Sequence, residues 1–125
     1  MNLRLPLALL CATMTSTAFG VGLVKDINTV PVGEYSGGAD FSLFATVAQG
    51  TLCRMDDGIH GAELWISDGT PGGTRLVKDI RPGPESSSIE QLTTVAGVGY
   101  FFADDGANGY ELWRSNGTEA GTSMM

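Results

Sequence analysis

The sequence predicts an all-β fold of antiparallel four-stranded meander repeats, arranged as about two propeller-like blades of a partial β-propeller. The first observation is an internal repeat. Residues 44–74 align with residues 92–122 without a gap, at an offset of 48, and 15 of the 31 aligned positions are identical. The second is that turn-forming residues divide each copy into runs of strand length. A repeat period of about 40 to 50 residues is typical of propeller blades.

The strands are clearest in the second copy. Runs at 92–96, 100–104 and 110–115 are separated by glycine-containing turns, and the fourth run, complete only in the first copy, spans 74–80. Runs of about five to seven residues joined by short turns form an antiparallel meander. Each copy therefore predicts one four-stranded sheet.

One more strand is expected near the N-terminus, because residues 23–27 and 76–80 share the sequence Leu-Val-Lys-Asp-Ile. The second copy ends at Met125, where such a strand should follow, so we expect residues 22–27 to complete its sheet. Two blades are fewer than the roughly four to eight of a closed propeller. We therefore expect either a truncated reading frame, a fragment of a longer array, or self-association through exposed blade faces.

The N-terminal residues 1–20 have the pattern of a secretory signal peptide. A basic residue precedes an apolar run, and a small-x-small cleavage site ends at Gly20. The apolar run is too short and too interrupted by polar residues for a transmembrane helix. A lipoprotein signal ending at Cys11 is the alternative. The sequence thus predicts an exported protein that is secreted, periplasmic or at the cell surface.

After the signal peptide, the expected organisation is an N-terminal strand with a Gly-rich linker at 21–43 and a first repeat at 44–80. A Pro/Ser-rich loop at 81–91 and a second, C-terminally incomplete repeat at 92–125 follow. The net charge of -7 is acidic. Because phosphate binding needs clustered Lys and Arg, the composition argues against a nucleic acid partner.

The residues conserved between the two copies resemble the bacterial ELWxxDGT repeat family. Its motif residues here are Glu63, Leu64, Trp65, Asp68, Gly69 and Thr70, and then Glu111, Leu112, Trp113, Asn116, Gly117 and Thr118. Asn116 departs from the family's Asp but forms the same kind of turn with Gly. The resemblance implies secreted or surface-associated, propeller-like proteins that have no established general activity.

The acidic turns are the candidate metal site. Asp56, Asp57, Asp104 and Asp105 could supply oxygen ligands to calcium, which wants about six to eight oxygens. No EF-hand loop is present, and Asp-Gly is also the ordinary chemistry of tight hairpin turns. No other cofactor is expected.

Other conspicuous residues have a structural and a functional interpretation. Trp65 and Trp113 could stack on sugars, but a Trp that recurs in a repeated strand is usually a packing residue. His60 is expected in an exposed loop. Asn116-Gly117-Thr118 fits the N-glycosylation pattern, but it is interpreted as a turn. Glu63 and Glu111 could be paired carboxylates, but equivalent repeat positions favour cross-strand pairing.

Cys53 is the single cysteine of the expected mature chain, because Cys11 leaves with the signal peptide. Phe101 occupies the equivalent position in the second copy, so we expect Cys53 in a buried strand. Arg54 stands where the second copy has Phe102, which predicts a less buried or terminal face there.

Three classes of function follow. The first is an exported, non-catalytic surface or interaction module with an unidentified protein or glycan partner. The second is a calcium-stabilised glycan-binding or adhesion module. The third is a fragment of a larger secreted enzyme. No catalytic residue is predicted, because the chain carries no nucleophile motif beside its one histidine.

Overall fold

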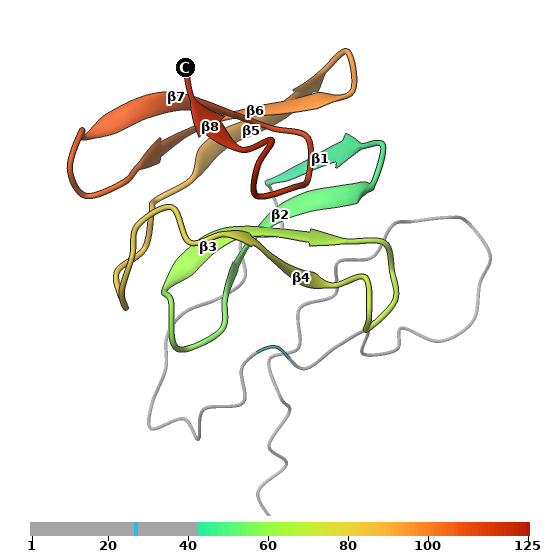
Figure 1. Ribbon diagram of the computed structural model, residues 1–125, viewed down its shortest axis with the longest axis horizontal. Coiled ribbons are helices and arrows are strands. Elements are labelled where there is room, and N and C mark those ends of the chain that lie inside the picture. The colour runs from blue at the N-terminus through green and yellow to red at the C-terminus, as the bar shows by residue number, and fades with distance from the viewer. Residues whose placement is uncertain (1–26, 28–42) are drawn as a thin grey trace, which may run out of the picture.

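The computed structural model describes residue 27 and residues 43–125, and this part of the chain forms eight strands and no helix (Figure 1). The strands are β1 (Phe44–Val47), β2 (Gly50–Asp56), β3 (Ala62–Ser67), β4 (Arg75–Lys78), β5 (Glu90–Val95), β6 (Val98–Asp104), β7 (Tyr110–Ser115) and β8 (Ser123–Met124).

The strands form two antiparallel four-stranded sheets. Sheet A has the order β1-β2-β3-β4 and sheet B the order β5-β6-β7-β8, so each strand pairs with its sequence neighbours. The registers repeat at the offset of 48: Cys53 pairs with Trp65 in sheet A, and Phe101 pairs with Trp113 in sheet B. The predicted all-β fold of propeller-like meander repeats is therefore confirmed.

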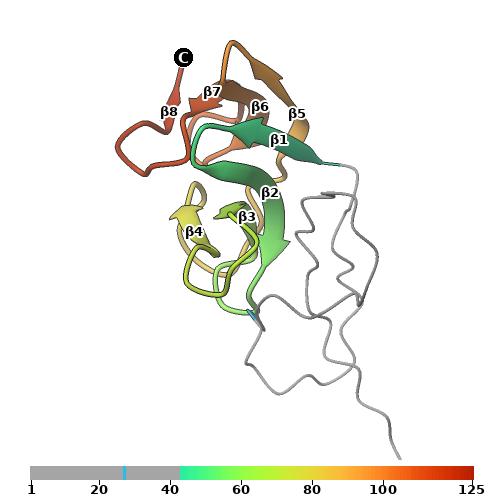
Figure 2. The same cartoon turned by 90° about the vertical axis from the view of Figure 1, so that its right-hand side faces the viewer.

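The two sheets lie face to face, with sheet B above sheet A in Figures 1 and 2. We call the facing surfaces the inner faces and the opposite surfaces the outer faces. One apolar cluster joins the inner faces and the segment between the sheets, and all its members are at most 8% exposed. Sheet A supplies Ala45, Val47, Leu52, Leu64, Ile66 and Val77, sheet B supplies Leu92, Phe101, Ala103 and Trp113, and the connecting segment supplies Ile80 and Ile89.

Polar contacts fix the relative position of the sheets along their edges. Thr94 Oγ1 donates to the carbonyl oxygen of Thr46 at 2.9 Å. The Arg75 guanidinium donates to the carbonyl oxygen of Gly117 at 3.2 and 3.1 Å. Because these side chains reach across the interface to backbone oxygens, they specify one arrangement of the apolar faces.

The inner faces approach most closely at Gly99 in β6. A Cβ atom at this position would lie 2.5 Å from Leu52 Cδ1. Leu52 is fully buried, so its side chain has little room to move away. The contact between the sheets therefore requires a glycine at residue 99.

The prediction that the second copy lacks a fourth strand of its own is wrong. Sheet B has its own fourth strand, because Ser123 and Met124 pair with Arg114 and Trp113 of β7. Of the expected N-terminal strand, residues 22–26 lie outside the described residues. Ile27 packs on the outer face of sheet A and not at the edge of sheet B.

Arg54 is less buried than its neighbours in β2, as one of the two expected alternatives had it, but it does not mark a terminal face. It alternates with Cys53 along β2 and shares the inner side of sheet A with Leu52 and Leu64. Its guanidinium donates to the carbonyl oxygen of Ile89 at 3.2 Å. A charged side chain is tolerated there because the connecting segment supplies an acceptor.

We expect Gly99→Ala to lower the free energy of unfolding by about 1–3 kcal/mol, because the added methyl group overpacks the contact with Leu52. The measurement is urea unfolding followed by circular dichroism. Gly72→Ala is the control, since a Cβ there meets nothing within 4 Å. Equal stability of Gly99→Ala and the unmodified chain would contradict the close approach.

Candidate functional site

The repeated Asp-Gly-Thr and Asn-Gly-Thr segments are turns with the same hydrogen bonds. Asp68 Oδ1 accepts from the Thr70 backbone N–H at 2.9 Å and from Thr70 Oγ1 at 2.6 Å. Asn116 Oδ1 accepts from the same groups of Thr118 at 3.0 and 2.7 Å. The prediction that Asn116 preserves the turn is confirmed.

A buried hydroxyl pair closes each of these turns. Ser67 Oγ lies 2.6 Å from Thr74 Oγ1, and the equivalent Ser115 Oγ lies 2.7 Å from Thr122 Oγ1. Each of the two threonines also donates to a backbone carbonyl in the turn. The Ser and Gly-Thr residues of the repeat therefore act in turn closure, which explains why they recur.

The four aspartates of the candidate calcium site hold their own hairpin turns. Asp57 Oδ1 accepts the backbone N–H groups of Ile59 and His60, and Asp105 Oδ1 accepts those of Ala107 and Asn108. Asp56 and Asp104 each accept a glycine N–H at 2.7 Å. Across residues 27 and 43–125, no group of three or more His, Cys, Asp or Glu side chains could hold a metal ion.

His60 lies in the first of these turns with its side chain 36% exposed, and its Nδ1 is 2.6 Å from Asp57 Oδ2. The hydrogen bond to Asp57 raises the pKa of His60. The pKa of Asp57 is lowered, because the hydrogen bonds from His60 and Ile59 outweigh the opposing effect of burial. The pair ties the hairpin together, in keeping with the predicted loop position of the histidine.

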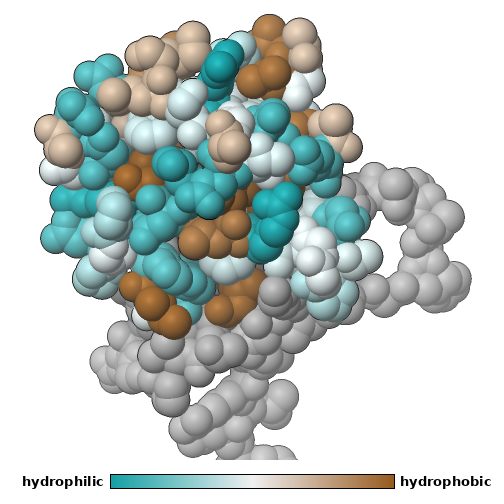
Figure 3. All heavy atoms as spheres, in the orientation of Figure 1, coloured by the Kyte–Doolittle hydropathy of each residue, from teal (hydrophilic) through white to brown (hydrophobic). Residues whose placement is uncertain are grey.

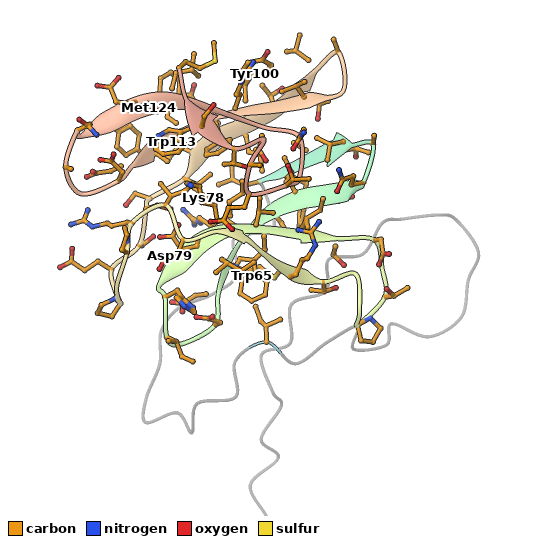
Figure 4. All side chains as sticks on the ribbon, viewed as in Figure 1. Trp65, Lys78, Asp79, Tyr100, Trp113 and Met124 are labelled. Carbon is orange, nitrogen blue, oxygen red and sulfur yellow. The ribbon has the colours of Figure 1, made fainter. Side chains whose placement is uncertain are left out.

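The two tryptophans are packing residues, as predicted. Trp65 is 7% exposed and Trp113 is 6% exposed. Figure 4 shows Trp113 pointing between the sheets and Trp65 pointing away from sheet B, below sheet A. Trp65 packs with Cys53 and Met55 on the outer face of sheet A, and Cys53 is buried as expected. Neither indole presents a face to solvent for sugar stacking.

Glu63 is the most unusual of the motif residues because it is fully buried. Its Oε2 accepts the backbone N–H of Ile80 at 2.9 Å, and its Oε1 accepts those of Arg81 and Ser87 at 3.3 and 3.2 Å. These three donors belong to the segment that joins the sheets. Glu63 therefore anchors this connection to β3.

Each of the two glutamates has a cross-strand partner, as predicted, but that partner is apolar. Glu63 pairs in register with Met55, and Glu111 pairs with Ala103. Glu111 is exposed, so the same motif position has opposite environments in the two copies. The difference arises because the segment after β4 folds its amides back on Glu63, whereas no described segment does so at Glu111.

Burial raises the pKa of Glu63 to about 7, against the lowering effect of its three N–H donors. The nearby Asp79 carboxylate acts in the same direction as burial. Oδ1 of Asp79 is itself buried without a hydrogen-bond partner among the described residues. Two acidic side chains, Glu63 and Asp79, are therefore buried near each other where the connecting segment leaves sheet A.

The outer face of sheet B is the exposed apolar surface of the described structure. Its side chains project from β5, β6 and β7 on the side away from sheet A, and the exposed members include Val95 at 57%, Phe102 at 37%, Tyr110 at 45% and Leu112 at 36%. Figure 3 shows tan and brown side chains along the upper edge of the molecule, over this sheet, and Figure 4 places Tyr100 there.

The anchoring role of Glu63 was not identified from the sequence. Exposed blade faces were expected, but the sequence prediction did not say which sheet would present one. A signal for the face was present in the repeat alignment. Leu52 and Ile66 of the inner face of sheet A correspond to Tyr100 and Arg114 of the outer face of sheet B. Aliphatic residues in one copy with amphipathic or charged residues in the other indicate a buried face and a solvent-accessible counterpart.

The comparisons with known proteins gave no match: no family model, no curated protein and no solved structure is similar to this chain. In the described residues, no helix is long and apolar enough to span a membrane.

We expect the contribution of Glu63 to stability to depend on pH. Its folded-state pKa of about 7 exceeds its ordinary value of 4.5, so the folded state holds the proton more tightly between these values. The contribution is fully present below about pH 4.5 and is lost as the pH rises through 7. The stability difference between the unmodified chain and Glu63→Gln should change by on the order of 3 kcal/mol across this range.

Urea unfolding at a series of pH values measures this difference. Glu111→Gln is the matched control, because it changes the same motif position where the carboxylate is exposed. The stability difference between this variant and the unmodified chain gives the baseline against which the Glu63→Gln difference is compared. If both variants follow the same pH profile, Glu63 does not titrate as expected.

Proposed function

We propose that this chain is an exported, non-catalytic repeat protein of the ELWxxDGT kind that binds a protein partner through the outer face of sheet B. One observation carries the proposal. Leu64 and Leu112 occupy the same position of the repeat, but Leu64 is fully buried against sheet B and Leu112 is 36% exposed. The same surface that one copy uses for sheet packing is thus open in the other.

The chemistry of the face supports a protein partner. Aromatic and aliphatic side chains at its centre are bordered by charged residues, which is the composition of the core and rim of protein interfaces. Contiguous exposed apolar surface of this kind commonly marks an interaction site. Phe102 and Tyr110 add the aromatic character that dominates binding energy in such sites.

The export part of the proposal rests on residues 1–20, which lie outside the described residues. Their basic start, apolar run and small-x-small ending support a cleaved secretory signal. The motif resemblance points to the same compartment, because the family is secreted or surface-associated. An acidic chain of net charge -7 is compatible with solubility after export.

Site-specific photo-cross-linking tests the binding surface. A photoreactive phenylalanine at Leu112, on the outer face of sheet B, should give a discrete protein adduct in the cells that make the chain. The same group at Thr70, an exposed turn residue of sheet A, is the matched control and should give none. Equal labelling from both positions, or no adduct from Leu112, would refute the assigned surface.

Fusion of residues 1–20 to a reporter that is active only after export tests whether this segment is a secretory signal. We expect reporter activity in a bacterial host and a mature N-terminus near Val21. Replacing Leu9 and Leu10 with Asp should abolish both, because a charged residue breaks the apolar run. Full activity of that variant would show that this segment does not direct export.

A further inference from the structure

The connecting segment, residues 79–89, is attached to sheet A through one buried carboxyl group. Glu63 is fully buried, and its oxygens accept the backbone N–H groups of Ile80, Arg81 and Ser87. The N–H groups of Ile80 and Arg81 have no other hydrogen-bond acceptor among the described residues. The start of the segment therefore depends on Glu63 for its attachment to β3.

The same segment is attached to sheet B. The carbonyl oxygen of Ser87 accepts the backbone N–H of Asp104 at 2.8 Å, and Arg81 Nη1 donates to Asp104 Oδ2 at 3.2 Å. Ile80 and Ile89, near the two ends of the segment, belong to the apolar cluster between the sheets. A change in the position of the segment would therefore alter the contacts of both sheets.

The charged groups near Glu63 do not favour its ionised form. Burial raises the pKa of Glu63, and repulsion from Asp79, directly after β4, acts in the same direction. His60, in the hairpin between β2 and β3, is attracted to Glu63 and Asp79 when it is protonated, but its ring is bonded to Asp57. Lys78 of β4 pairs in register with the residue that follows Glu63, on the opposite face of the sheet.

The remaining neighbours also leave the carboxylate without a counter-ion. Met55, opposite Glu63 on β2, is apolar. The guanidinium of Arg81 is bound by Glu85 and Asp104. The ionised form of Glu63 therefore has three N–H donors but no salt-bridge partner among the described residues, and most of the cost of burying its charge remains.

Movement of the connecting segment away from β3 would return the Glu63 carboxyl to water. Its pKa is about 7 in the closed structure, against an ordinary value of 4.5. Between these values the closed form holds a proton that the open form releases, so a rise in pH favours the open form. Local opening of this kind leaves the strands paired, and it is distinct from global unfolding.

We propose that Glu63 is a pH-sensitive switch that keeps the connecting segment closed on both sheets in acid and lets it open locally as the pH rises above neutral. In its protonated form the carboxyl supplies a donor for Asp79 Oδ1, which is buried without a partner among the described residues. Ionisation removes this donor and leaves two like charges facing each other. The switch does not depend on the binding surface of sheet B.

Amide hydrogen exchange followed by NMR tests the switch, with the rates expressed as protection factors so that the intrinsic effect of pH is removed. Between pH 5 and pH 8, the protection of the Ile80 and Arg81 amides should fall by roughly fiftyfold, because Glu63 releases its proton on opening. Low concentrations of urea should leave the exchange of these two amides unchanged at pH 8, since local opening exposes little surface. The amides within the paired strands β6 and β7 are the internal reference and should respond to urea.

Three variants assign the effect to its residues. Glu63→Gln should abolish the pH dependence of protection at Ile80 and Arg81, because an amide does not ionise. Glu111→Gln is the matched control and should leave that pH dependence in place, since Glu111 is exposed and no described segment folds over it. Asp79→Asn should make the fall in protection smaller, because it removes the carboxylate that opposes ionisation of Glu63.

Constant protection of both amides between pH 5 and pH 8, or a pH dependence that survives Glu63→Gln, would overturn the switch. If Glu63→Gln does not fold, the side-chain carboxyl ¹³C shift of Glu63 in the unmodified chain replaces it: a titration midpoint near 7 supports the switch, and one near 4.5 overturns it. A urea dependence at Ile80 and Arg81 equal to that of β6 and β7 would show that the segment opens only with the whole chain, which would overturn the local opening.

Discussion

The packing of the inner face of sheet A on that of sheet B is the interaction on which the rest of the structure depends. A four-stranded meander has an apolar face that it cannot bury alone, so each sheet becomes stable only against another. The contact packs Leu52 and Leu64 against sheet B, where Trp113 on the opposite side completes the cluster. The turns, the connecting segment and the edge hydrogen bonds all serve to bring these two surfaces together in one alignment.

Glu63 shows how this packing changes the meaning of a repeated motif. In β3 the residue is enclosed because the chain must pass from one sheet to the other directly over it, and the passing backbone supplies N–H groups. In β7 no described segment makes such a passage, and Glu111 stays in solvent. Identical residues at equivalent positions therefore have opposite environments, and the cause is their place in the chain order rather than the motif itself.

The repeat made much of the fold predictable. The run at residues 110–115 was placed with its observed bounds, and the turn chemistry of Asp68 and Asn116 was interpreted correctly, because these features depend on local sequence. The short strand β8 was missed, since two residues carry no periodic pattern. The enclosed carboxylate was also missed, and the expected exposed face was not assigned to a sheet, because both depend on contacts between segments that are distant in sequence.

The close approach at Gly99 has a consequence for the assembly of longer arrays from this unit. The position equivalent to Gly99 in the first copy is Thr51, and the position equivalent to Leu52 in the second copy is Tyr100. A tandem fusion of two such chains would therefore oppose a threonine and a tyrosine where the natural junction opposes a glycine and a leucine. The two sheets are not interchangeable modules, and an engineer who wishes to extend the stack must first rebuild this junction with smaller side chains.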